Sequence, residues 1–196
     1  MLISDDPEAV ELRAVNWAAG LMRWEPYQAP GGRAYPLNHL HPLRYQVELP
    51  PQNGRPGLEV WVNVGFAMHC FTRDLVHNDA EDLHYRDDRE CRAFCFDRYD
   101  LSHRLPEIAR TLPQRTCQFA KNENYVTLDH LTPDGSVITY GAFFNVKRQA
   151  ADTVMLVFQS AYAIDSDPKR QPPGKGKIGL RVLLGHALRG TKPKRP

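Results

Sequence analysis

The chain has 196 residues, of which 42% are hydrophobic and 10% aromatic, so it can build a buried core and is not disordered throughout. No apolar run approaches the roughly 18 residues needed to cross a bilayer, which excludes a membrane-spanning helix. The formal net charge of +2 hides an asymmetry, because residues 168–196 hold nine Lys and Arg and no Asp or Glu, whereas residues 1–167 hold 16 Lys and Arg against 23 Asp and Glu.

A helix is predicted within the first segment, residues 1–24, with its regular part at about 7–23. Asp6 can cap this helix and Pro7 suits its first position. The acidic start of the chain has no signal-peptide pattern, so we expect a cytoplasmic protein. The next segment, residues 25–42, contains four prolines and no periodicity, which indicates a linker or a clamp on the surface.

Strand patterns dominate the remaining domain, which we place at residues 43–190 and which precedes a basic disordered tail at 191–196. Alternation of apolar and polar residues, or a continuous apolar run, predicts each strand. The expected strands are residues 43–49, 58–66, 91–99, 117–120, 125–131, 136–146, 153–164 and 178–184.

The fold class that these patterns predict is α+β. Hairpin signals such as Pro133–Asp134–Gly135 outnumber crossover helices, so we expect a mainly antiparallel, twisted sheet. Besides the N-terminal helix, we predict one short helix near 102–112, because apolar residues there recur at spacings of four, three and four. The charged residues 74–90 are expected to form an exposed loop.

The densest chemical pattern is HCFTR, residues 69–73. His69 can act as acid or base, because its ordinary pKa lies near neutrality. Cys70 would be a nucleophile if a neighbouring cation lowered its pKa, and Arg73 can hold an anion. The alternative is structural: Cys70 then fills the core and His69 caps a strand.

A metal site is not predicted, and neither is any cofactor. Cys91 and Cys95 lie on a predicted strand, where a separation of four residues places side chains about 13 Å apart, too far for one zinc ion.

Two further places offer groups for anion binding and proton transfer. Arg98 and Tyr99 lie at the end of the predicted strand 91–99, and Tyr162 interrupts the most apolar strand together with Ser160 on the same face. These polar groups either line a cleft or join a buried network. His186 follows the last apolar run and is the remaining candidate proton carrier.

The basic end of the chain predicts contact with a polyanion, most often nucleic acid. Its PPGKGK stretch lacks the spacing of a phosphate-binding loop, so nucleotide hydrolysis is rejected. The alternative is a solvated tail that aids solubility. The residues predicted to contact nucleic acid are Lys169, Arg170, Lys175, Lys177, Arg181 and Arg189.

The segments HPLRY, HCFTR and QSAY resemble those of uncharacterised short proteins of phages and prophages. This resemblance implies a small protein of a mobile element, such as a toxin, a defence component or an inhibitor of host defence. The order of a helix before an antiparallel sheet resembles small metal-independent ribonucleases of the RelE and barnase type. No catalytic motif of those enzymes can be placed on this chain.

Our leading hypothesis is a nucleic-acid-directed protein that acts as a metal-independent, toxin-like endoribonuclease. Such cleavage needs a base, an acid and cations for the phosphate. His69 would be base or acid, Arg73 and Arg98 would hold phosphate, and Tyr99, Tyr162 or His186 would be the second proton carrier. The alternative is a non-enzymatic inhibitor or adaptor that binds a protein or a nucleoprotein complex. A Cys70 thiol enzyme is a third option.

Overall fold

The computed structural model describes Ala18, Gly54 and residues 20–51, 56–120, 124–131, 135–164 and 175–194. The strands are β1 (Tyr27–Gln28), β2 (Ala34–Tyr35), β3 (Leu43–Leu49), β4 (Leu58–Phe66), β5 (Thr72–Arg73), β6 (His84–Arg86), β7 (Cys91–Phe94), β8 (Thr116–Phe119), β9 (Asn124–Leu131), β10 (Val137–Arg148), β11 (Thr153–Ile164) and β12 (Lys175–Gly179). The helices are α2 (Phe96–Ser102), α3 (Leu105–Thr111) and α4 (Leu180–Leu188), with 3₁₀ turns η1 (Asn38–Leu40), η2 (Met68–Cys70), η3 (Glu81–Leu83) and η4 (Leu112–Gln114).

Seven strands form the main sheet, in the order β12-β8-β9-β10-β11-β4-β3. Every neighbouring pair is antiparallel except β11 and β4, which are parallel. The chain between these two strands contributes the second sheet, β5-β7-β6, and both α2 and α3. The predicted α+β class is therefore confirmed, and the sheet is mixed rather than wholly antiparallel.

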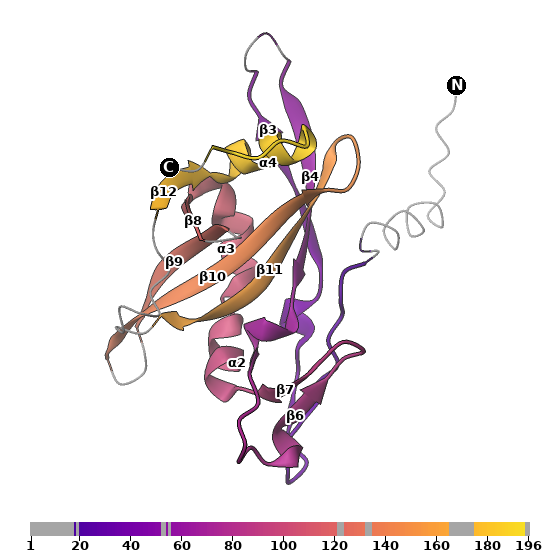
Figure 1. Ribbon diagram of the computed structural model, residues 1–196, viewed down its shortest axis with the longest axis vertical. Coiled ribbons are helices and arrows are strands. Elements are labelled where there is room, and N and C mark those ends of the chain that lie inside the picture. The colour runs from indigo at the N-terminus through magenta and orange to yellow at the C-terminus, as the bar shows by residue number, and fades with distance from the viewer. Residues whose placement is uncertain are drawn as a thin grey trace, which may run out of the picture.

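The main sheet curls so that one helix reaches both of its edges. Helix α4 contacts the edge strands β3 and β12 as well as the central strand β10 (Figure 1). Arg181 on α4 fixes this arrangement, because its Nε donates to the Glu48 carbonyl on β3 and its Nη1 donates to the Pro113 carbonyl in η4, each at 3.1 Å. A residue predicted to bind nucleic acid thus also bridges segments far apart in the chain.

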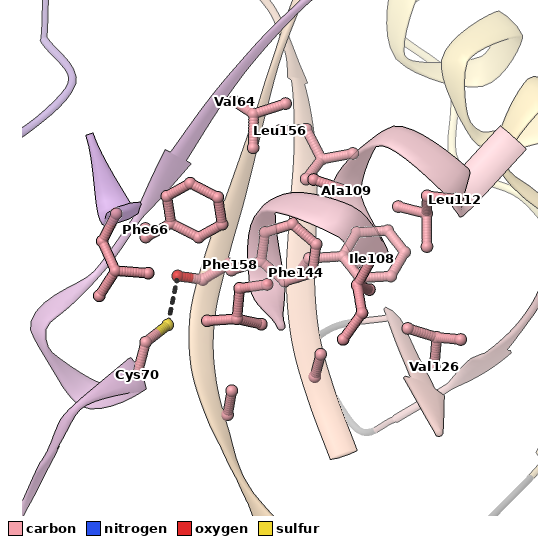
Figure 2. Packing of buried hydrophobic residues seen from close by; sticks show 14 of the residues in the cluster. Val64, Phe66, Cys70, Ile108, Ala109, Leu112, Val126, Phe144, Leu156 and Phe158 are labelled. Carbon is pink, nitrogen blue, oxygen red and sulfur yellow. Dashed lines mark hydrogen bonds between the residues drawn. The ribbon is translucent and has the colours of Figure 1, made fainter. Parts of the chain in front are cut away.

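The core lies between the sheet and helices α3 and α4. Figure 2 shows Ile108 of α3 and Leu112 of η4 beside Phe144 and Phe158, which come from β10 and β11. All four side chains are at most 1% exposed. The apolar face predicted for the short helix is therefore confirmed, since its spacing does place these residues inward.

Strand β11 matches its predicted bounds, and a β-bulge explains its polar interruption. Phe144 on β10 pairs with Phe158, but the next residue along, Phe143, pairs with Ser160, so Gln159 is the extra residue. The bulge keeps Phe158 and Ala161 on the core face and leaves Ser160 on the opposite face. Strands β3 and β4 also match the predictions.

Residues 25–42 lie mostly at the surface, but three of their side chains enter the core. Tyr27, Leu37 and Leu40 are 3%, 0% and 0% exposed. Hydrogen bonds fix this segment to the second sheet, where the Tyr27 hydroxyl donates to the Asp82 carbonyl at 2.8 Å and the Tyr85 hydroxyl donates to the Glu25 carbonyl at 2.7 Å. The segment therefore forms only the short elements β1, β2 and η1, yet it contributes buried side chains.

Three helix boundaries differ from the predictions. The strand predicted at 91–99 ends at Phe94, and α2 begins at Phe96. The prediction of a strand from the alternating pattern was therefore wrong beyond Phe94. The helix predicted at 102–112 divides into α2, which ends at Ser102, and α3, which begins at Leu105 beside Pro106. The hydroxyl of Ser102 does not cap α3, because it donates backwards to the Tyr99 carbonyl at 2.6 Å.

The last apolar run was also misassigned. Residues 178–179 are strand, but Leu180–Leu188 is α4, in which the buried residues Leu180, Leu183 and Leu184 have helical spacing. Most of the predicted N-terminal helix lies outside the described residues, and residues 20–24 are not helical. Within the described part of the chain, no helix is long and apolar enough to cross a membrane.

We predict that Phe158→Ala lowers the free energy of unfolding by about 3–5 kcal/mol, because it opens a cavity among packed aromatic rings. Val157→Ala is the matched control, since its side chain lies on the other face of β11 and is partly exposed, so its cost should be about 1 kcal/mol. Urea denaturation measures both values. Equal losses would contradict this assignment of the strand's faces.

Candidate functional site

The HCFTR segment forms η2 and β5 and leads to a small cluster of charged side chains. His69 Nε2 lies 2.9 and 3.1 Å from the two carboxylate oxygens of Glu90, which precedes β7. The two side chains are 39% and 36% exposed, so this imidazole–carboxylate pair faces solvent. Arg92 places Nη1 3.6 Å from Glu90 and 2.7 Å from Asp74.

Arg92 is held firmly in this cluster. Its side chain is 10% exposed, and its Nε donates to the Thr72 hydroxyl at 2.9 Å. The cluster therefore combines a group that can transfer a proton, a carboxylate that orients it and a fixed guanidinium beside the same carboxylate. Glu90 and Arg92 were not predicted from the sequence, because they approach His69 only through the β5-β7-β6 sheet.

Arg73 lies on β5 beside this cluster, and its charge is balanced by Asp79. Both terminal nitrogens of Arg73 donate to the Asp79 carboxylate. This hydrogen bonding, together with the Val76 amide, lowers the pKa of Asp79 to about 2. A phosphate at Arg73 would have to compete with this carboxylate.

The structure brings Arg98 and Tyr162 to the same region. Arg98 Nη1 donates to the carbonyls of His69, at 3.0 Å, and Thr72, at 2.7 Å, while its guanidinium lies 5.1 Å from the centre of the Tyr162 ring. Burial lowers the pKa of Arg98 below its usual value. Arg98 thus contacts the His69 backbone and the Tyr162 ring, whereas Arg73 is paired with Asp79.

Tyr99 and His186 do not belong to this region. Tyr99 is 9% exposed, packs among Tyr35 and Phe94, and has a pKa raised by burial. His186 lies on α4, where its Nδ1 is 2.8 Å from the Thr191 hydroxyl. Figure 1 shows α4 at the end of the molecule opposite to β6 and β7.

Cys70 is unsuited to act as a nucleophile. Its side chain is 0% exposed, and burial raises the pKa of the thiol to about 12. Its Sγ donates to the Phe158 carbonyl at 3.5 Å, which Figure 2 shows within the core. In the described ranges, no three His, Cys, Asp or Glu side chains are arranged to hold a metal ion.

The basic end of the molecule is formed by β12, α4 and the residues that follow. Residues 175–194 carry six Lys and Arg and no Asp or Glu, and Lys177, Arg181 and Arg189 are exposed. At the opposite end, residues 74–90 carry seven Asp and Glu against two Arg. Lys169 and Arg170 lie outside the described residues, and Lys175 is placed on β12 opposite Phe119.

Gly185, a buried residue of α4, leaves room for the side chain of Arg189. A Cβ atom at this position would lie 3.0 Å from Arg189 Nη1, so the missing side chain lets the Arg189 guanidinium fold back against the helix. Glycine within a helix costs about 1 kcal/mol of stability relative to alanine. Here it leaves space for the Arg189 guanidinium beside the helix.

Comparison with known proteins gives the family. Residues 26–188 match the model of the YjaZ family. The chain belongs to this family. Protein YjaZ of Escherichia coli (strain K12) is 28% identical over 170 residues, which cover 85% of this chain and 94% of that protein. No solved structure matches.

The matched range includes both candidate regions. It contains the cluster around His69 and Glu90, the contact of Arg98 with Tyr162, and all of α4. The tail cations Lys192 and Lys194 lie beyond it. The name of the YjaZ family states no reaction.

A stacked histidine pair is a further feature that the sequence patterns did not reveal. The rings of His39 and His103 lie 3.8 Å apart and nearly parallel, and His39 Nε2 is 2.7 Å from the Ser102 hydroxyl. Because Ser102 donates its proton to the Tyr99 carbonyl, the imidazole must donate to Ser102, which places the proton of neutral His39 on Nε2.

We predict that His39 makes the fold sensitive to mild acid. Burial, followed by the charges of His103 and His41, lowers the pKa of His39 from 6.5 to about 4, and the Pro36 carbonyl offsets only part of this shift. The unfolded state therefore binds a proton first. The associated stability is present above pH 6.5 and is lost as the pH falls toward 4, by about 2–3 kcal/mol between pH 7 and 4.5.

Urea denaturation across this pH range tests the prediction in the wild type and in His39→Gln. The glutamine amide can still donate to Ser102 but does not titrate. His84→Gln serves as the control for loss of an ordinary histidine. An unchanged pH slope in His39→Gln would contradict the assignment.

Proposed function

We propose that the protein is directed to nucleic acid, RNA in the first place, and that it binds the phosphate backbone through the basic end formed by β12, α4 and the residues that follow. One observation carries this proposal: residues 175–194 hold six cations and no acidic residue, with two cations on β12, one on α4 and three in the residues that follow. Phosphate contacts of this kind supply affinity without sequence preference.

The pattern of ion pairs supports the proposal. Among the described residues, the ion pairs involve His69, Arg73, Arg89 and Arg92, and none involves a residue of 176–194. The cations from Lys177 to Lys194 are therefore not neutralised by carboxylates of the described residues. The acidic residues 74–90 lie at the other end, so an RNA backbone would first be attracted to the side of α4.

We expect RNA binding with a steep salt dependence. Each neutralised phosphate of a single strand contributes about −0.7 to the slope of log K against log salt, so Lys177→Ala with Arg189→Ala should make the slope shallower by about 1.4. Filter binding of a single-stranded RNA between 50 and 200 mM salt measures this.

The matched control is Arg86→Ala with Arg89→Ala, which removes the same charge from the acidic end. The control should leave the slope unchanged. Absence of binding at 50 mM salt, or equal effects of the two double variants, would remove the proposal.

RNA cleavage without a metal ion is the second candidate, and the exposed contact between His69 and Glu90 favours it. Glu90 would accept the proton of the 2′-hydroxyl, which attacks phosphorus. His69 as imidazolium would give a proton to the departing 5′-oxygen, leaving a 2′,3′-cyclic phosphate and a 5′-hydroxyl. Arg92 would stabilise the charge that develops on the phosphate.

For this reaction we expect His69→Ala and Glu90→Gln each to slow RNA cleavage in EDTA by about 10²–10⁴-fold, the usual share of acid–base catalysis. Tyr99→Phe and His186→Ala are controls, because both residues lie away from the cluster. Gel analysis of a labelled RNA measures the rates. Intact RNA with the wild type would exclude cleavage while leaving the binding proposal standing.

The alternative of an inhibitor or adaptor is supported by the opposite polarity of the two ends. The acidic residues 74–90 would then contact a basic groove of a protein or nucleoprotein complex. A cytoplasmic location and an association with phages or prophages stay predictions.

A further inference from the structure

We propose that Arg98 is the recognition residue of a second anion site, separate from the basic end, which takes the oxyanion of a small ligand, a phosphate or a carboxylate group. Arg98 lies on α2 between η2 and β11, two elements that α2 contacts. This region is at the end of the molecule away from α4 (Figure 1).

The guanidinium of Arg98 is fixed before any ligand arrives. Nη1 donates to two carbonyls, those of His69 and Thr72, at 3.0 and 2.7 Å. One face of the group lies over the Tyr162 ring, 5.1 Å from its centre. Two backbone groups and one aromatic ring therefore hold the cation in a single orientation, which reduces the entropy lost on binding.

Arg98 differs from its neighbours in having no carboxylate partner. Arg73 and Arg92 pair with Asp79 and Asp74, but within the described part of the chain no carboxylate lies within 4.0 Å of Arg98. Arg92 is close enough to repel it, and the groups that interact favourably with it are Cys95, Tyr162 and Cys70. This is a largely buried positive charge without a counter-ion.

The donors left over on Arg98 match an oxyanion. With Nη1 engaged, Nε and Nη2 donate to no group of the described residues. These two N–H groups form the parallel pair that binds a carboxylate or phosphate through two hydrogen bonds. Nearby, the buried Tyr140 hydroxyl has no hydrogen-bond partner among the described residues and interacts electrostatically with Arg98.

These observations favour a ligand over a purely structural role. The two carbonyl contacts account for the hydrogen bonds of Nη1. They do not account for a largely buried guanidinium that has neither a carboxylate partner nor full solvation. A buried charge without a partner is costly, and proteins normally compensate it. An anion seated on Nε and Nη2 would supply that compensation.

Thermal unfolding in phosphate and in chloride of equal ionic strength tests the site. With a dissociation constant near 1 mM, 100 mM phosphate should raise the midpoint of the wild type by about 5–10 °C beyond chloride. Arg98→Met, which keeps the packing against Tyr162, should lose this increment. Arg104→Met removes the same charge from an exposed position and should keep it, as should Lys192→Ala with Lys194→Ala at the basic end.

Acetate in place of phosphate distinguishes the two ligand classes, because a larger increment with acetate would assign a carboxylate. Arg98→Lys and the line width of the ³¹P signal provide a second measurement if Arg98→Met does not fold. Lysine keeps the charge but loses the paired donors. The affinity for phosphate, measured from the broadening of the ³¹P signal, should therefore fall about tenfold. No phosphate-specific increment in the wild type, or the same increment in Arg98→Met, would overturn the site.

Discussion

The parallel pairing of β4 with β11 is the interaction on which the arrangement of this molecule depends. Residues 61–66 pair in register with residues 153–158, although the partners Trp61 and Thr153 lie 92 positions apart in the chain. The pairing continues beyond the strands, because the Phe158 carbonyl accepts from the Ala67 amide at 2.8 Å and from the Cys70 thiol. It thereby fixes η2, and with it His69, against the end of β11.

Several functional features follow from this contact. Once η2 is fixed, Arg98 can reach the carbonyls of His69 and Thr72 from α2 while it lies over Tyr162 of β11. The bulge at Gln159 places Tyr162 on the face away from the core. The charged cluster and the site proposed at Arg98 are therefore both built on the strand pair that organises the core.

The molecule separates its charges along its length. Arginines near the acidic end are bound to carboxylates or carbonyls, as Arg73, Arg89, Arg92 and Arg98 show. At the other end, Arg181 bridges two carbonyls, while the side chains of Lys177, Arg189, Lys192 and Lys194 are exposed and have no carboxylate partner among the described residues. Cations thus stabilise the fold at one end and form the proposed nucleic-acid-binding surface at the other. This division explains why a single formal charge of +2 describes the protein poorly.

The sequence by itself determined the features that depend on local pattern. Alternation located β3, β4 and β11, the spacing of Leu105 and Ile108 identified the buried face of α3, and the charge count located the basic end. Local pattern failed where tertiary packing selects between two structures. The residues after Cys91 alternate like a strand, but those from Phe96 form α2. The apolar segment Leu180–Leu188 is compatible with a strand or a helix, and its packing against β3, β10 and β12 selects the helix α4. Only the tertiary structure decided which charges meet, because Glu90 and Arg92 reach His69 across a sheet, and no spacing along the chain encodes that approach.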